Sequence, residues 1–133
     1  MDYISTNHSK HLLRVHLIFA CKYRKPLMNR YGEQIKTILQ SVAEKKGLRI
    51  IAMEVDLDHI HLLVQYPPTY SVLEIVRLFK QTTTYKIWRQ NENAKDLRKH
   101  FWKEHTFWSD GYFACSIGQV SKAAIENYIR NQG

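Results

Sequence analysis

Apolar and polar positions alternate along this chain with two different periods, and these periods predict its secondary structure. A period of two, which places every second side chain on one face of a strand, covers residues 12–21, 48–55 and 59–66. A period near 3.6, which places one apolar stripe on a helix, covers residues 30–46 and 72–89. The pattern therefore predicts a chain that mixes strands with helices.

Turn and capping residues set the ends of these elements. Gly47 fits the C-cap of the first helix, and Ser71 with Glu74 three residues later predicts a capping box for the second. The connection over 56–58 is too short for a crossover, so the strands on either side of it should form an antiparallel hairpin. The threonine run 82–84 is a poor helix former, which allows a bend in the second helix.

The last third of the chain has weaker periodicity. Residues 91–105 are polar and charged, and indicate a loop with some helix. A last strand region is expected over 107–117, with a turn or bulge at Asp110-Gly111, and a final helix over 122–131. The order is then strand, helix, strand, strand, helix, strand and a C-terminal helix.

This order predicts an α+β protein with the ferredoxin-like split βαβ layout, also used by RNA-recognition modules. It implies a four-stranded antiparallel sheet with helices on one face, plus a C-terminal helix. The length of 133 residues suits one domain, so we expect residues 1–133 to form a single unit. The second face of the sheet should stay open for a partner.

A His-x-His pair lies in the third strand. His59 and His61 are two residues apart, so they share one face of the strand, whereas Ile60 and Leu62 point to the other, toward the core. By the same parity Arg14, with His16, belongs to the open face. Two imidazoles side by side can hold one metal ion, although a His-x-His pair alone is often a pair of ordinary surface histidines.

The charge balance points to a polyanion as the partner. Twenty Lys and Arg against 12 Asp and Glu give a net charge of +8, which is typical of nucleic-acid binding. No apolar run is long enough for a membrane span and the N-terminus lacks signal-peptide features, so we expect no membrane partner and a cytoplasmic location. Cys21 and Cys115 are far apart in apolar segments, and are expected to be buried free thiols.

A tyrosine near the C-terminus adds a candidate nucleophile. Tyr128 and Gln132 are four residues apart, so they would lie on one face of the final helix. A tyrosine hydroxyl can attack a phosphodiester, and a glutamine oxygen can join two imidazoles around a divalent ion. Each residue also has an ordinary interpretation, as a packed ring and as a polar residue near the chain end.

Taken together, these motifs resemble the IS200/IS605-type single-tyrosine HUH transposases. The HUH motif is His59-Ile60-His61, and the tyrosine motif is Tyr128-Ile129-Arg130-Asn131-Gln132. The stretch from His16 to Arg24 and the stretch 107–113 are also similar to the family. The resemblance covers roughly residues 10 to 132 in the order and spacing of the family.

The resemblance implies a specific activity. Such enzymes cut and rejoin single-stranded DNA at transposon ends marked by hairpins, through a 5′-phosphotyrosine and a free 3′-OH. It implies Tyr128 as the nucleophile, and Mg²⁺ or Mn²⁺ held by His59, His61 and Gln132. It also implies a homodimer whose active sites are shared between subunits. Asp56 and Asp58 are candidates for a substitute or supporting carboxylate, or are simply turn residues.

The DNA contacts are less defined. The expected backbone contacts are Arg14, Lys22, Arg24 and Lys25 near the open face, with Arg77, Lys80 and Lys86 elsewhere. Unpaired bases could stack on Tyr23, Tyr112 or Trp108. Two other functions remain open: a repeat-associated tyrosine transposase acting on dispersed hairpins, and a non-catalytic single-stranded DNA or RNA-binding module.

Overall fold

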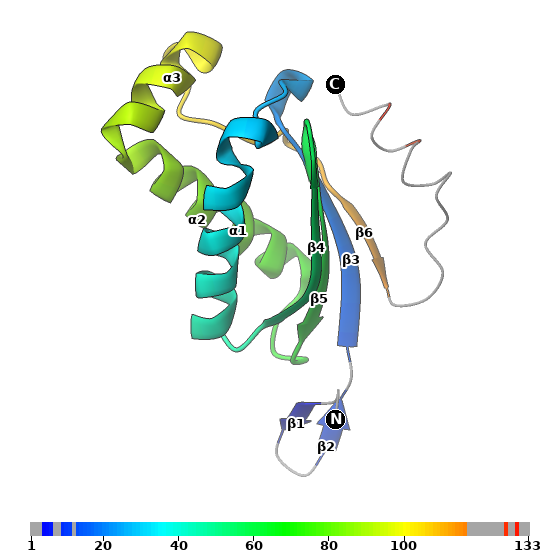
Figure 1. The fold of residues 1–133 in the computed structure, drawn as a ribbon. Coiled ribbons are helices and arrows are strands. Elements are labelled where there is room, and N and C mark those ends of the chain that lie inside the picture. Colours follow the sequence, from blue (N-terminus) through cyan, green and yellow to red (C-terminus); the bar gives the residue numbers. More distant parts are fainter. Residues whose placement is uncertain (1–3, 7–8, 12, 117–126, 128–129, 131–133) are drawn as a thin grey trace.

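A four-stranded antiparallel sheet forms the centre of the computed structural model, and helices cover one of its faces (Figure 1). The structure describes the chain except for residues 1–3, 7–8, 12, 117–126, 128–129 and 131–133. The strand order is β4-β5-β3-β6. The strands are β3 (Leu13–Ala20), β4 (Arg49–Asp56), β5 (His59–Tyr66) and β6 (Phe113–Ser116). This is the predicted α+β architecture.

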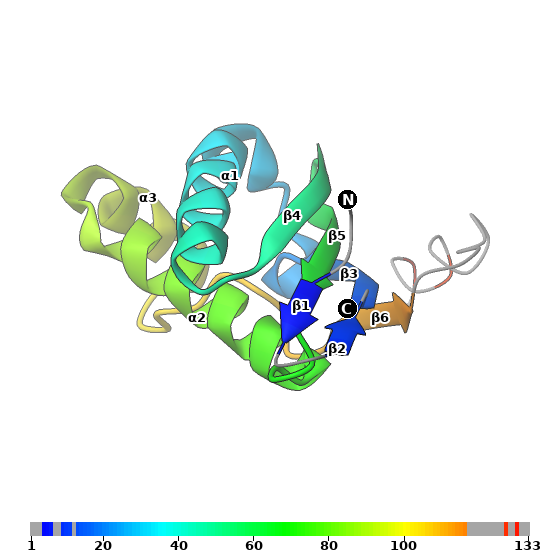
Figure 2. The same cartoon turned by 90° about the horizontal axis from the view of Figure 1, so that it is seen from below.

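The helices follow the strands as the split βαβ layout requires. They are α1 (Met28–Lys45), α2 (Val72–Arg89) and α3 (Asn91–Phe101). Seen from below, all three lie on the same side of the sheet (Figure 2). A short 3-10 turn, η1 (Lys22–Arg24), follows β3, and a small separate sheet pairs β1 (Ile4–Thr6) with β2 (Ser9–His11). The sequence pattern did not predict this small sheet.

The core lies between the sheet and the helices. Ile60, Leu62 and Val64 of β5 are fully buried, as their parity predicted. They meet apolar residues of β3 and of the helices, which include Leu17, Phe19, Ile35, Leu39, Ile75 and Phe79. Because the alternate residues of β5 are used in this way, its remaining side chains must point to the opposite face of the sheet.

Helix α2 begins with the predicted capping box. The Ser71 hydroxyl accepts a hydrogen bond from the Glu74 backbone N–H at 3.1 Å, and the Glu74 carboxylate accepts one from the Ser71 N–H at 2.8 Å. The helix runs through the threonine run as one element. Thr83 is buried, donates to the Phe79 carbonyl, and accepts from the indole of Trp108 at 2.9 Å. Its hydroxyl is therefore satisfied, which offsets its low helix propensity.

Two expectations for the second half of the chain are wrong in part. The segment interpreted as a loop with some helix contains α3, whose buried Ala94, Leu97 and Phe101 form a stripe at helical spacing. The expected long last strand is reduced to β6, and Trp108 forms only an isolated bridge with Cys21. Polar residues outnumber the apolar stripe in α3, which hid its period in the sequence.

The two cysteines differ in burial. Cys21 is a buried free thiol, and burial raises its pKa to about 12. Cys115 is free but half-buried, so the expectation of two buried thiols holds only for the first. No described helix is long and apolar enough to cross a membrane.

Lys80 fixes the segment that precedes β6. Its ammonium group donates to the carbonyl oxygens of Ser109 at 2.8 Å, Asp110 at 3.3 Å and Gly111 at 2.7 Å. Burial lowers its pKa to about 8, and the charge of Asp110 opposes that shift. Lys80 was a candidate for a DNA contact, but in the structure its three donors serve these carbonyls.

We predict that Lys80→Met destabilises the protein by about 1–3 kcal/mol, because it leaves carbonyl oxygens of residues 109–111 without a donor. Urea unfolding monitored by tryptophan fluorescence measures the change. Lys45→Met, at an exposed position near the end of α1, is the matched control and should alter the free energy of unfolding little. Equal stability of the two variants would contradict the role of Lys80.

Candidate functional site

The histidine pair lies at the beginning of β5, on the face of the sheet opposite to the helices. In the register of the sheet, His59 is directly opposite Ala20 of β3, and His61 is directly opposite Ile18. On the other side, the partner of His61 in β4 is Glu54. Both histidines are half-buried. The pair thus lies on β5, one of the two central strands, and on the face that the parity of the sequence predicted.

His16 of β3 contacts the second histidine directly. Its Nδ1 lies 3.1 Å from Nε2 of His61, and the ring centroids are 5.3 Å apart. One of these nitrogens must accept the hydrogen bond, so at least one of the two rings is neutral. Burial lowers the pKa of His61, and the neighbouring His16 lowers it further, while Glu54 acts in the opposite direction. The site therefore favours a neutral His61, the form that binds metal.

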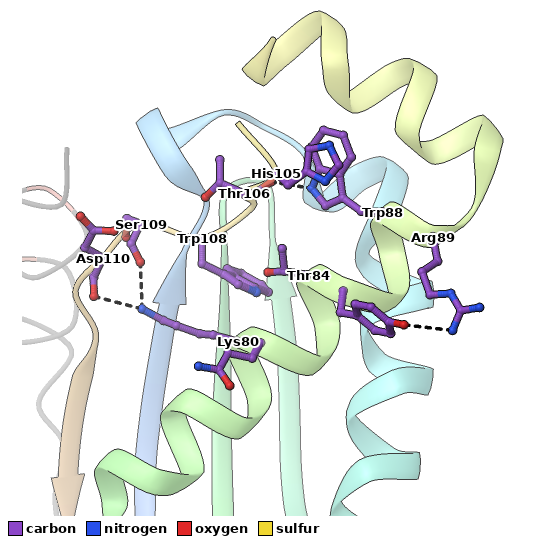
Figure 3. A pocket seen from close by; sticks show the side chains of 11 residues that line it. Lys80, Thr84, Trp88, Arg89, His105, Thr106, Trp108, Ser109 and Asp110 are labelled. Atoms are coloured by element: carbon purple, nitrogen blue, oxygen red, sulfur yellow. Dashed lines mark hydrogen bonds between the residues drawn. The ribbon is translucent and has the colours of Figure 1, made fainter. Parts of the chain in front are cut away.

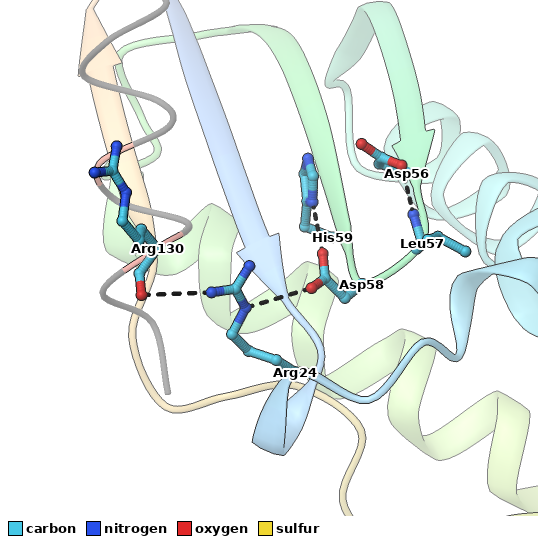
Figure 4. A network of polar contacts seen from close by, with 6 residues as sticks. All are labelled: Arg24, Asp56, Leu57, Asp58, His59 and Arg130. Atoms are coloured by element: carbon cyan, nitrogen blue, oxygen red, sulfur yellow. Dashed lines mark hydrogen bonds and ion pairs between the residues drawn. The ribbon is translucent and has the colours of Figure 1, made fainter.

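Asp58 holds the first histidine from the turn between β4 and β5. Its Oδ1 lies 2.9 Å from Nδ1 of His59, and its Oδ2 lies 3.3 Å from Nε of Arg24 (Figure 4). A carboxylate at Nδ1 orients the ring and leaves Nε2 as the nitrogen for a ligand. This contact favours Asp58, rather than Asp56, as the carboxylate that orients a histidine. The neighbouring Asp56 instead accepts a hydrogen bond from the Leu57 backbone N–H, which is the role of a turn residue.

Arg24 connects this turn with the C-terminal segment. While Nε pairs with Asp58, its Nη1 donates to the backbone carbonyl of Arg130 at 3.4 Å (Figure 4). Arg130 lies between Tyr128 and Gln132 in the sequence, and both of these predicted site residues are outside the part of the chain that the structure describes. The contact therefore connects the described residue Arg130 with the arginine that pairs with Asp58.

The η1 turn that carries Arg24 has an unusual backbone. Tyr23 and Arg24 have φ values of 58° and 52°, in the left-handed region that residues with a side chain rarely adopt. Contacts on both sides hold it: Tyr23 Oη donates to Glu104 at 3.2 Å, and Lys22 pairs with the same carboxylate at 3.8 Å. Strained backbone of this kind is typical of functional sites and persists only where surrounding contacts fix it.

The predicted DNA contacts divide into different environments. Arg14 donates to the side chain of Gln65 at 3.1 Å, and both Lys22 and Arg24 are in ion pairs, while Lys25 is half-buried beside them. These partners do not test DNA binding, which stays a prediction for all four residues. They show that Lys22 and Arg24 also have a structural role.

The candidates for base stacking differ more clearly. Tyr23 is exposed, whereas Trp108 is buried and donates its indole N–H to Thr83. Tyr112 is half-buried against the core. Of these three residues, only Tyr23 therefore presents an open ring to a base.

The donor chemistry of the pair fits a divalent ion. Two imidazoles share one face, one of them with a lowered pKa, and Asp58 orients the other ring. Within the described residues, no three His, Cys, Asp or Glu side chains converge as a complete site. Any further ligand must therefore be a different residue type, a residue outside the described part, solvent or substrate. Gln132 meets the first two conditions.

Sequence reasoning named two partners of the histidines, His16 and Asp58, but did not establish their contacts. The alternation of β3 placed His16 on the open face, but the contact with His61 is diagonal between strands and depends on their register. Asp58 was one of two candidate carboxylates in the turn, with Asp56. Spacing along the chain does not show which of them contacts a histidine ring and which accepts from a backbone N–H. Glu104, which anchors the η1 turn, had no signal in the sequence.

Comparison with known proteins gives consistent matches. The family model described as "Transposase IS200 like" matches residues 9–132. The transposase for insertion sequence element IS200 of Salmonella typhimurium is 32% identical over 98% of this chain and 84% of its own length. The ISDra2 transposase TnpA of Deinococcus radiodurans is 29% identical over 90% of this chain and 84% of its own length.

Solved structures agree with these matches. A crystal structure of a candidate transposase from Deinococcus radiodurans R1 superposes with a TM-score of 0.84, at 26% identity, over 97% of both chains. A repeat-associated (REP) tyrosine transposase bound to a REP hairpin superposes with a TM-score of 0.57, over 96% of this chain and 68% of that one. The latter is only 12% identical, so it shows the shared fold alone.

Proposed function

The chain belongs to the family of IS200-like transposases, and from this premise we propose that it cuts and rejoins single-stranded DNA at the hairpin-marked ends of an insertion sequence. Membership makes it a DNA-processing enzyme of the single-tyrosine type. The match over residues 9–132 supports treating residues 1–133 as one transposase domain. The pair His59 and His61, held on the open face by Asp58 and His16, is the observation that carries the proposal.

Tyr128 is the proposed nucleophile. Its phenolate oxygen attacks the scissile phosphorus, a P–O bond forms to tyrosine, and the bond from phosphorus to the 3′ oxygen breaks. The leaving 3′ oxygen takes a proton and becomes a free 3′-OH, while the other strand end stays as a 5′-phosphotyrosine. Attack of a 3′-OH on such a linkage reverses these bond changes and rejoins DNA without an external energy source.

His59, His61 and Gln132 are the proposed ligands of Mg²⁺ or Mn²⁺. When bound there, the ion would stabilise the negative charge that develops on the phosphate oxygens. Asp58 keeps the ring of His59 oriented, and His16 keeps that of His61 in place. A bond from the ion to Nε2 of His61 would replace the hydrogen bond to His16.

Basic residues of the site are proposed to hold the DNA backbone. Lys22, Arg24 and Lys25 follow the end of β3 directly, beside the histidine pair, and Arg14 lies on the same strand. Because backbone contacts carry no sequence information, these residues would position the strand rather than select it. The net charge of +8 supports a polyanionic substrate.

A covalent adduct tests the nucleophile and the histidine site together. We expect the protein, incubated with Mn²⁺ and a single-stranded oligonucleotide that contains an end hairpin and its flank, to form an adduct visible on a denaturing gel. Tyr128→Phe removes the attacking oxygen and His61→Ala removes a ligand, so both should lose the adduct. Tyr66→Phe, on β5 outside the pair, is the matched control.

The outcomes of this experiment separate tyrosine chemistry from binding alone. An adduct that persists in Tyr128→Phe refutes the nucleophile. Binding without any adduct in the unmodified protein favours a non-catalytic binding module. A repeat-associated transposase would form the same adduct, and hairpins dispersed through the genome, rather than flanking the gene, would identify that alternative.

A second experiment tests the proposed homodimer with shared sites. Mixing Tyr128→Phe with His61→Ala gives heterodimers in which one site combines an intact histidine pair with an intact tyrosine from the partner. If sites are shared, the mixture should recover about a quarter of the adduct yield, since about half of the dimers are mixed and each has one complete site. No recovery after refolding the two variants together would show that each subunit uses its own tyrosine.

Metal affinity tests the part played by Asp58. We expect Asp58→Ala to weaken Mn²⁺ binding about 10-fold or more, since loss of a carboxylate that orients a histidine ligand has this effect. Asp56→Ala is the matched control, because Asp56 binds a backbone N–H instead of a ring. Isothermal titration without DNA gives the dissociation constants, and equal losses in both variants would contradict a specific role for Asp58.

A further inference from the structure

A pocket of about 640 Å³ lies on the helical side of the molecule, between the C-terminal half of α2 and the segment 105–110 (Figure 3). The proposed reaction does not use it. Its wall on α2 consists of two adjacent stripes at helical spacing, one formed by Lys80, Thr84 and Trp88 and the other by Gln81, Tyr85 and Arg89. His105, Thr106, Trp108, Ser109 and Asp110 complete the lining.

Aromatic rings make up much of this lining. Trp88 and His105 stack in parallel, with ring centroids 4.3 Å apart and an angle of 9° between their planes. The indole N–H of Trp88 is satisfied by the Thr106 carbonyl at 2.9 Å, which fixes that ring. Tyr85, in contrast, is 60% exposed at the rim, although it is a large aromatic residue. The pocket thus offers a rigid aromatic floor and one open ring.

A cation accompanies the open ring. The guanidinium of Arg89 lies 5.3 Å from the centre of the Tyr85 ring, and Nη1 donates to the tyrosine hydroxyl at 3.3 Å. Arg77, two turns before Tyr85 on the same stripe, and Lys86 are also exposed. Asp110 is the one acidic residue among those that line the pocket. The rim along α2 is therefore positively charged next to an aromatic surface.

The pocket and the histidine site lie at the same end of the sheet, on opposite faces. The segment 107–109 is hydrogen-bonded to the end of β3: Lys22 N–H donates to the Phe107 carbonyl, and Ser109 N–H to the Ala20 carbonyl, both at 2.8 Å. Ala20 is directly opposite His59 in the register. One strand end therefore separates the two places, so a single polynucleotide strand could occupy both.

We propose that this pocket binds an unpaired nucleobase of single-stranded DNA, with the base stacked on Tyr85 and the adjoining phosphate paired with Arg89. The identity of the nucleic acid rests on the proposed function. An exposed aromatic ring beside a planar guanidinium suits a base and its phosphate, because every base presents a flat π-face whatever its sequence. The volume accommodates such a group, and the positive rim attracts a polyanionic strand.

Binding of fluorescein-labelled oligothymidine, measured by anisotropy without metal, tests the pocket. Tyr85→Ala should weaken binding by about 5-fold or more, the lower range for loss of one base–aromatic stack. Tyr85→Phe keeps the ring and should bind like the unmodified protein. Leu73→Ala removes an exposed apolar side chain from the first turn of the same helix, outside the pocket, and should change nothing. With a blunt duplex as the probe, the effect of Tyr85→Ala should disappear.

The charge contribution has its own measurement. Arg89→Gln should lower the slope of log affinity against log salt concentration by about one, as expected for one lost phosphate contact. Lys45→Gln, an exposed cation on α1, should leave the slope unchanged. Photocrosslinking with 5-iodouracil in the oligonucleotide, followed by peptide mapping, should mark peptides that contain residues 81–89 or 105–110.

The results separate this inference from the proposed function. An unchanged affinity of Tyr85→Ala for oligothymidine, crosslinks confined to other peptides, or no binding at all would overturn the pocket. The covalent adduct with a hairpin substrate tests the transposase chemistry independently. A chain that forms the adduct but does not depend on Tyr85 keeps its function and loses the pocket, and one that depends on Tyr85 without an adduct shows the reverse.

Discussion

The register between β3 and β5 is the constraint on which the whole structure depends. Leu17 is paired with Leu62 and Phe19 with Ile60, so both strands bury their aliphatic residues under the helices. A shift by one residue would turn His59 and His61 into that core and expose the aliphatic residues. Burying two polar rings without partners would cost several kcal/mol, so core packing itself fixes the histidines on the open face. Stability and site geometry thus come from the same pairing.

The end of β3 is where several independent contacts converge. Cys21 forms an isolated β-bridge with Trp108, the next turn contains two residues with positive φ, and Glu104, in the segment after α3, holds that turn. Lys80 fixes the following segment through three carbonyls. A site built at a strand end usually gains access at the expense of rigidity, and these contacts restore the rigidity.

The sequence predicted the sheet, α1, α2 and the face of the histidine pair, because periodicity reports directly which side of an element is buried. The sequence predicted poorly those contacts that run diagonally between strands or that come from loops. The contact between His16 and His61 depends on the offset between two strands, and the choice between Asp56 and Asp58 depends on one turn geometry. The stripe of α3 was diluted by charged residues. Tyr128 and Gln132 were identified by a motif alone, and both lie outside the described residues, so their roles stay predictions.

A balance between hydrogen bonds and metal ligation follows from the arrangement around His61. Nε2 of this ring is bound to His16, whereas Nε2 of His59 is left open because Asp58 binds the opposite nitrogen. The two histidines are therefore prepared differently. If both rings hold the proposed ion, His59 would bind it through a ring that Asp58 already orients, whereas His61 would exchange its contact with His16 for the bond to the ion. Because burial lowers the pKa of His61, this exchange does not also require removal of a proton from a charged ring near neutral pH.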